Sequence, residues 1–169
     1  TGGASHEIAS RLNAGKWLYT DQTAAESSTT NYADFDFQNG WSNSGTTANN
    51  YVSHMWRRAP GFFDVVAYTG SGSQSTVVKH NLGVVPEMVW RKRRDSAQKW
   101  YVWASALSGA SAQYSGNFGS SGSLGNLEYY TGDSQFAHLT SPTATEFTQG
   151  VLYQSSNTYI SYLFASVDG

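Results

Sequence analysis

Hydrophobic and polar residues alternate along residues 62–70, "FFDVVAYTG". In an extended chain one face carries Phe63, Val65 and Ala67, and the other carries Asp64, Val66 and Tyr68. Successive side chains of a β-strand point to opposite sides, so a period of two indicates a strand. Residues 62–70 are therefore predicted to form one.

Two more stretches show this period and lie close enough in sequence to pair. Residues 84–90, "VVPEMVW", predict a turn at Pro86 followed by a strand, and residues 99–105, "KWYVWAS", predict the next strand. The short polar stretch 91–98, "RKRRDSAQ", separates them. The simplest interpretation is a hairpin with the polar stretch as its connection.

The composition favours strands and tight turns over helices. Aromatic residues make up 15% of the chain, and it contains 17 glycines and only 3 prolines. Aromatic side chains pack well on pleated surfaces, and Gly and Asn accept turn conformations. Residues 109–125, with five glycines and five serines, predict a long surface loop, and only residues 4–12 suggest a helical turn or two. The prediction is an all-β protein with little helix.

One hydrophobic pattern occurs twice. "YVSHMW" at 51–56 aligns with "YISYLF" at 159–164, and upstream "DFDFQNGW" at 34–41 aligns with "ATEFTQGV" at 144–151. The shared unit would be a strand, an Asn-Gly or Gln-Gly turn, a loop and a second strand. This predicts that residues 62–169 form a complete domain, and that residues 1–61 are the C-terminal part of a preceding copy or an N-terminal extension. Short Gly- and Tyr-rich strands can also resemble one another by chance.

Charge and cysteine content narrow the classes of function. The net charge is −2, only 13% of residues are charged, and no cysteine is present. These values do not indicate a nucleic-acid-binding protein and leave no disulfide or thiolate metal site. There is no apolar run of 18 or more residues, so no membrane insertion is predicted.

Motifs for catalysis or metal binding are incomplete. "SHEI" at 5–8 begins like a zinc-protease motif, but Ser10 stands where the second histidine is needed. "DFDFQNG" at 34–40 offers oxygen ligands for calcium, yet its alternating phenylalanines fit a strand better. Neither a G-x-S-x-G elbow nor a phosphate-binding glycine loop is present. We predict no enzyme, no metal and no cofactor.

The basic run at 91–94 is the first candidate contact site. Its flanking tryptophans would add stacking and cation–π contacts to a phosphate or an anionic glycan. The alternatives are a solvated hairpin rim or a contact with an acidic neighbouring subunit. The candidate residues are Arg91, Lys92, Arg93, Arg94, Trp100 and Trp103.

Aromatic residues in or beside predicted loops form the second candidate set. Sugar faces stack on such rings, and binding residues concentrate on loops. The alternative is that these rings pack in the core or between sheets. The candidates are Trp41, Tyr114, Phe118, Tyr129 and Tyr130.

Four segments together resemble a repeated domain of virion proteins of tailed bacteriophages, especially marine ones: "GFFDVVAYTGSG", "HNLGVVPEMVWRKRRDSAQKWYVW", "SPTATEFTQG" and "NTYISYLFA". The resemblance covers residues 62–169, and 23–61 as the end of a preceding copy. It implies an antiparallel β-sandwich of jelly-roll or lectin-like type in a tail fibre or other virion appendage, and it brings no catalytic residues. "MVWRKRR" departs from the usual pattern because it is more basic.

The resulting hypothesis is a structural protein of a virion appendage with a role in host-surface attachment. Its partners would be other virion proteins or copies of itself, with a trimer favoured, and a host-surface glycan. Two alternatives remain: a purely structural spacer or decoration module, and a carbohydrate-binding module of a larger depolymerase.

Overall fold

The computed structural model describes residues 6–28, 33–35, 40–43, 52–72, 75–106, 113–116, 128–130, 139–140, 142–150 and 156–167. Within these ranges the protein consists of antiparallel strands and one short 3-10 turn, η1 (Arg11–Asn13), so the all-β prediction is confirmed. The helical turns expected at 4–12 are reduced to η1, because Glu7–Ala9 forms strand β1 and pairs with β2.

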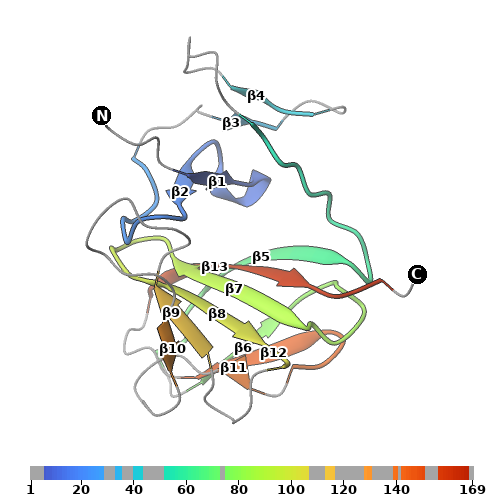
Figure 1. Ribbon diagram of the computed structural model, residues 1–169. Coiled ribbons are helices and arrows are strands. Elements are labelled where there is room, and N and C mark those ends of the chain that lie inside the picture. The colour runs from blue at the N-terminus through green and yellow to red at the C-terminus, as the bar shows by residue number, and fades with distance from the viewer. Residues whose placement is uncertain are drawn as a thin grey trace.

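A six-stranded antiparallel sheet, here called the large sheet, is the centre of the fold (Figure 1). Its spatial order is β10-β9-β8-β7-β13-β5. The strands are β5 (Phe63–Thr69), β7 (Met88–Arg93), β8 (Trp100–Ala104), β9 (Gln113–Gly116), β10 (Glu128–Tyr130) and β13 (Thr158–Phe164).

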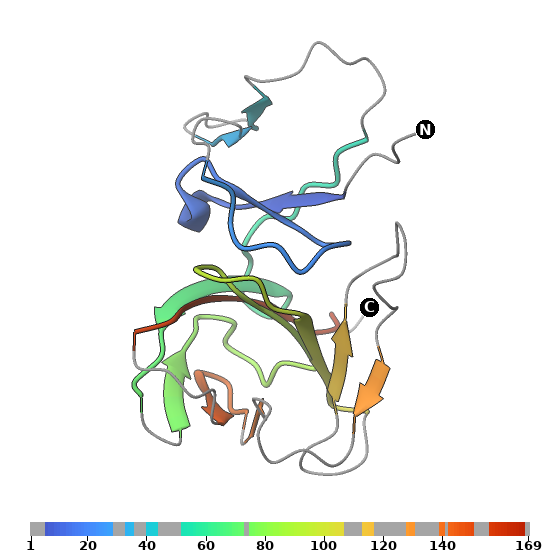
Figure 2. The same cartoon turned by 90° about the vertical axis from the view of Figure 1, so that its left-hand side faces the viewer.

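A three-stranded sheet, here called the small sheet, packs on one face of the large sheet (Figure 2). It contains β6 (Ser75–Lys79), β11 (Leu139–Thr140) and β12 (Glu146–Gly150), in the order β11-β12-β6. Val78 and Phe147 from the small sheet share a buried cluster with Val89 and Leu163 from the large sheet. The two antiparallel sheets therefore enclose one hydrophobic core.

An N-terminal hairpin covers the opposite face of the large sheet (Figures 1 and 2). It is formed by β1 and β2 (Trp17–Tyr19), and Leu18 is fully buried in a second cluster that includes Trp100 and Ile160. Central strand β13 is consequently covered on both faces. Its five residues Tyr159–Leu163 are all buried, which explains a nearly continuous apolar run instead of a clean alternation.

The predicted hairpin of two aromatic strands is confirmed, but its boundaries differ. β7 pairs with β8, and Arg91 lies opposite Tyr101. β7 continues through Arg93, because β13 provides a pairing partner as far as that residue. The connection is therefore residues 94–99, and three of the four basic residues belong to the strand.

Two further expectations need correction. The predicted loop at 109–125 contains strand β9, and residues 109–112 and 117–125 lie outside the described part of the chain. The strand expected at 51–56 is wrong for residues 52–56, which have no regular secondary structure and are exposed, whereas the aligned Tyr159–Phe164 lies in β13. The same pattern takes two structures because β13 lies between two strands, while no strand ladder includes 52–56 in the described ranges.

A small two-stranded ribbon lies between the N-terminal hairpin and segment 52–58 in sequence. Its strands are β3 (Ala33–Asp34) and β4 (Ser42–Asn43). Of the strand expected over 34–40, only Asp34 lies in β3; Phe35 and Gly40 have no regular secondary structure, and residues 36–39 lie outside the described ranges. The boundary predicted at residue 61 stays a prediction.

Candidate functional site

The first two residues of the basic run point to opposite faces of the large sheet. Both belong to β7, in which successive side chains alternate sides. Arg91 lies on the side of the small sheet. Lys92 lies on the side of residues 6–28, here called the N-terminal segment. Their exposed fractions are 3% and 0%, so neither is available at the surface.

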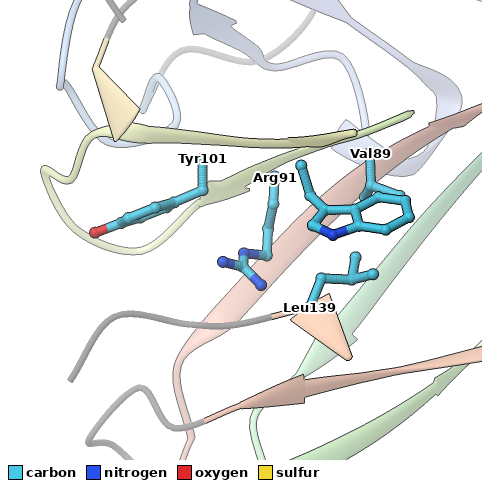
Figure 3. Close-up of a pocket in the computed structure, with 5 residues that line it drawn as sticks. Val89, Arg91, Tyr101 and Leu139 are labelled. Atoms are coloured by element: carbon cyan, nitrogen blue, oxygen red, sulfur yellow. The ribbon is translucent and has the colours of Figure 1, made fainter. Parts of the chain in front are cut away.

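Arg91 lies in a small hollow between the two sheets (Figure 3). The figure shows Arg91 between Tyr101 and Val89, with its guanidinium directed to the side on which Leu139 lies. The guanidinium carbon is 5.3 Å from the centroid of the Tyr101 ring, within the range of a cation–π contact. Trp103 completes the lining, so the structure brings two predicted contact residues, Arg91 and Trp103, into one hollow.

Three tyrosines surround the Arg91 charge. Burial lowers the pKa of Arg91, while the nearby hydroxyls of Tyr68, Tyr101 and Tyr159 act in the opposite direction. Burial also raises the pKa of Tyr68 to about 12. Tyr68 therefore stays neutral under ordinary conditions, and Tyr101 offers Arg91 a ring face.

Lys92 fastens the N-terminal segment to the connection between β7 and β8. Its Nζ donates hydrogen bonds to the carbonyl oxygens of Thr23 at 3.0 Å, Gln98 at 2.7 Å and Arg93 at 3.4 Å. Burial, with the neighbouring Arg93 charge, lowers the pKa of Lys92 to about 8. The buried ammonium group is thus bonded to three backbone acceptors, which replace the water it has lost.

Arg94 makes a second connection to the N-terminal segment. Its Nε and Nη2 donate to the two carboxylate oxygens of Glu26 at 2.8 and 3.1 Å, a bidentate pair. Asn13 Nδ2 donates to Glu26 Oε1 at 2.5 Å, and Ser10 Oγ donates to Asn13 Oδ1 at 2.6 Å. Four side chains therefore form one network, which joins the β1–β2 connection to Glu26 and Arg94.

Arg93 completes the set of internal contacts. Its Nε lies 2.5 Å from Asp95 Oδ1, and Asp95 Oδ2 accepts the backbone N–H of Thr158 at 3.2 Å. All four basic residues therefore interact within the chain. The expectation of a solvated rim or a basic patch open to a partner is wrong for Arg91 and Lys92, because the sheet is covered on both faces at their positions.

The predicted aromatic contact residues do not form one surface. Trp100 is fully buried on the N-terminal side, where Nε1 donates to the carbonyl oxygen of Tyr19 at 2.8 Å. Trp41 is half-buried and its ring centroid lies 6.4 Å from that of Phe35.

The remaining predicted aromatic residues lie in β9 and β10, at the edge of the large sheet away from β5, or outside the described part. Tyr114 is in β9, Tyr129 and Tyr130 are in β10, and Tyr129 pairs with Tyr114 in backbone register. Their side chains, and Phe118 as a whole, lie outside the described part.

An aromatic cluster that the sequence did not single out lies where segment 52–58 crosses the large sheet. Trp56 packs on Phe63, Trp90 and Phe164, with ring centroids 5.9, 6.1 and 5.8 Å away. Trp56 keeps 47% of its surface exposed, whereas Phe63 beneath it is buried. The cluster therefore presents an indole ring to solvent on a rigid aromatic base.

Beside this cluster, three chain segments that carry exposed apolar residues lie side by side, joined by backbone hydrogen bonds. We call these residues the end patch: Phe62, Val84, Val85 and Val167, with exposed fractions of 43, 39, 52 and 66%. Exposed apolar residues that cluster in this way mark contact surfaces more often than scattered ones do.

Backbone hydrogen bonds hold the three segments of the end patch side by side. Ala165 N–H donates to the Phe62 oxygen at 3.0 Å, and Glu87 N–H donates to the Phe164 oxygen at 2.9 Å. Gly61 N–H donates to the Leu82 oxygen at 2.6 Å. In the sequence this surface is visible only as apolar residues close to Gly and Pro, in "PGFF" and "GVVP".

Over the described ranges, no helix is long and apolar enough to cross a membrane. The same ranges contain no group of three or more His, Cys, Asp or Glu side chains that could hold a metal ion.

The fold and these surfaces define an all-β domain whose basic run is bonded within the chain, with the exposed apolar residues of the end patch at one end. A family model described as a domain of unknown function (DUF7483) matches residues 3–169, and the chain belongs to this family. The match includes the N-terminal hairpin as well as both sheets. Comparisons with curated proteins and with solved structures gave no match.

Proposed function

We propose that this chain is a non-enzymatic structural module of a bacteriophage virion appendage, such as a tail fibre, and that it contributes to attachment at the host surface. The proposal starts from the resemblance of "GFFDVVAYTGSG" and the three later segments to the phage virion domain. An all-β fold buried on both faces of its central sheet suits a rigid element of such an appendage.

The observation that carries the proposed mode of contact is the end patch. Phe62, Val84, Val85 and Val167 expose apolar area at one end, and Trp56 lies on the neighbouring face. The strongest basic cluster, by contrast, makes its contacts within the chain. A partner would therefore be held mainly by apolar and aromatic contacts, with a weak dependence on salt.

Location in the virion can be tested directly. Antibodies raised against the purified chain should label an appendage of the purified phage particle in electron micrographs. Intact particles that carry no label, with the protein absent from their peptide spectrum, would contradict the proposal.

Attachment is tested by competition. The purified chain should reduce phage adsorption to host cells, and the double variant Val85→Ser, Val167→Ser should lose this effect. Val77→Ser is the matched control, because Val77 is 56% exposed on β6, outside the end patch. If the chain labels the appendage but does not compete, the spacer alternative is supported instead.

The exposed face of Trp56 favours one second candidate, a carbohydrate-binding module. A ring half open to solvent over a fixed aromatic base is suited to stacking on a sugar. A glycan array probed with the purified chain should then give binding that Trp56→Ala removes. Binding that survives this change, or no binding at all, would count against this candidate.

A further inference from the structure

Strand β5 is the last strand of the large sheet, and one of its two edges faces away from β13. Gly70 N–H donates to the Asn157 oxygen at 2.8 Å, and Ala165 N–H donates to the Phe62 oxygen at 3.0 Å. Hydrogen bonds of an antiparallel pair alternate along the strand, so the even-numbered residues of β5 face β13. The backbone groups of the odd-numbered residues therefore face outward.

The first half of this outer edge is already paired. Phe63 exchanges two backbone hydrogen bonds with Ala59, at 2.9 and 3.0 Å. Val65 N–H donates to Asp64 Oδ1 at 2.9 Å, and Arg58 holds the same carboxylate oxygen at 2.5 Å. These contacts occupy both outward backbone groups of Phe63 and the N–H of Val65, so another strand is blocked at Phe63 and can pair at Val65 only through its C=O.

The second half has no such protection. No hydrogen bond within the described ranges involves the backbone N–H or C=O of Ala67 or Thr69, and both residues are exposed. The stretch 65–69 contains no charged residue and no proline, and its pairing with β13 continues without a bulge. Natural edge strands are usually protected from pairing by a charged residue, a proline or a bulge, and this stretch has none of the three.

We propose that this open edge pairs with the same edge of a second copy of the chain, antiparallel and related by a two-fold axis at Ala67. In this register Ala67 lies opposite its own copy, and Val65 lies opposite Thr69 of the second copy. No like charges meet, and the small Ala67 side chains allow close approach at the axis. Such an interface is self-complementary, as a two-fold dimer requires.

The second sheet supports this choice of partner. β6 is the edge strand of the small sheet, and Figure 2 shows β5 and β6 on the same flank. Val77 of β6 is 56% exposed. A second copy on this flank would continue the large sheet and would also approach Val77. The inference names a dimer surface and does not depend on the proposed virion role.

Amide exchange at several protein concentrations tests the pairing. In dilute solution the amides of Ala67 and Thr69 should exchange fast, while those of Val66 and Tyr68, which face β13, stay protected. Raising the concentration should slow exchange at Ala67 and Thr69 by at least about tenfold, as pairing protects them. Sedimentation should show the mass rising from 18.4 kDa to twice that value over the same range.

Charge substitution at the axis gives a sharper test. Ala67→Lys places two like charges together and should give a monomer, and so should Ala67→Glu. Mixing the two variants should restore the dimer, because opposite charges then meet at the axis. Ala97→Lys, a matched change at an exposed alanine in the β7–β8 connection, should leave the dimer unchanged.

Three results would overturn the inference. The first is a monomer at every concentration with fast exchange at Ala67 and Thr69. The second is protection of these amides in the dilute monomer, which would mean that another part of the chain covers the edge. The third is an assembly, such as a trimer, that Ala67→Lys does not affect although the variant folds normally by circular dichroism.

Discussion

At the scale of single residues, the unusual feature of this protein is that two basic side chains are buried in its interior. Arg91 and Lys92 follow one another in sequence, yet each is buried on a different face of the same sheet. Arg91 packs over the Tyr101 ring, and Lys92 donates to backbone carbonyl oxygens. A buried charge is tolerated only when such partners replace water, so both residues depend on their surroundings.

Replacing Lys92 with methionine should destabilise the protein at pH 7 by about 1–3 kcal/mol. The Thr23 and Gln98 carbonyl oxygens would lose their ammonium donor, and the methionine side chain offers no hydrogen bond in its place. Urea denaturation measures the change, and Lys79→Met, at an exposed lysine, is the control. Equal stability of the two variants would show that the Lys92 contacts contribute nothing net.

The same residue should leave a mark on the pH dependence of stability. The pKa of Lys92 is about 8 in the folded chain, below its ordinary value of 10.5, so the unfolded chain binds the proton more strongly. The contribution of Lys92 to the free energy of unfolding is therefore fully present above pH 10.5, and it is lost as the pH falls through 8. The wild-type protein should gain stability from pH 8 to 9.5 relative to Lys92→Met, and parallel curves would contradict this.

His80 should lower the free energy of unfolding as the pH falls below 6.5. Its Nδ1 accepts the N–H of Leu82 at 3.2 Å, and burial lowers the pKa of His80 below 6.5. Below that pH the unfolded chain takes up the proton more readily, so the stability of the folded state falls. His80→Gln should flatten the decline between pH 6.5 and 5, while His54→Gln, at an exposed histidine, should not.

At the scale of elements, the β7–β8 hairpin is the anchor for the N-terminal segment. Lys92, Arg94 and Trp100 all come from β7, β8 or their connection, and each bonds to a residue between Tyr19 and Glu26. The backbone adds to this, since Glu26 N–H donates to the Arg94 oxygen at 2.8 Å. The basic run is thus better described as a clamp than as a binding patch.

Glu26→Gln should loosen this clamp. It replaces a bidentate charged pair with Arg94 by a single neutral contact, where the Glu26 side chain is only 9% exposed. We expect a loss of about 1–3 kcal/mol and faster amide exchange at Glu26 and Gln98, whose N–H groups bridge the two segments. Glu7→Gln on exposed β1 is the control, and an equal effect there would argue against a specific clamp.

At the scale of the whole molecule, the protein has three layers: the small sheet, the large sheet in the middle, and the N-terminal hairpin (Figure 2). The N-terminal hairpin supplies Leu18 to a core that also contains Phe63 and Ile160, so residues on both sides of position 61 share one cluster. The family match likewise runs from residue 3 to residue 169. These contacts predict cooperative unfolding of the hairpin with the sheets.

Leu18→Ala tests that cooperativity. Leu18 is fully buried, so the substitution should cost about 2–5 kcal/mol and shift one transition seen by both tryptophan fluorescence and circular dichroism. Leu12→Ala, at a leucine that is 38% exposed, should cost much less. Two separate transitions, with only one shifted by Leu18→Ala, would show that the hairpin folds independently.

Much of the strand content was predictable from local pattern, whereas the candidate sites were not. The alternation in "FFDVVAYTG" located β5 and divided its side chains correctly, with Phe63 and Val65 in one cluster and Val66 and Tyr68 against the other. The pattern of "YVSHMW" failed, because an apolar run becomes a strand only beside another strand. The end patch was not predicted, because its residues come from three segments that only the tertiary structure brings together.

Local sequence was enough to establish an all-β protein, its two aromatic strands and their pairing, because a period of two is a property of neighbouring residues. Tertiary structure alone decided whether the basic residues of "RKRR" are buried or exposed. Whether a basic residue on a strand meets water or protein depends on what covers each face of the sheet, and here the small sheet covers Arg91 and the N-terminal segment covers Lys92. Those covering elements lie up to 69 residues away in sequence, beyond the reach of any local pattern.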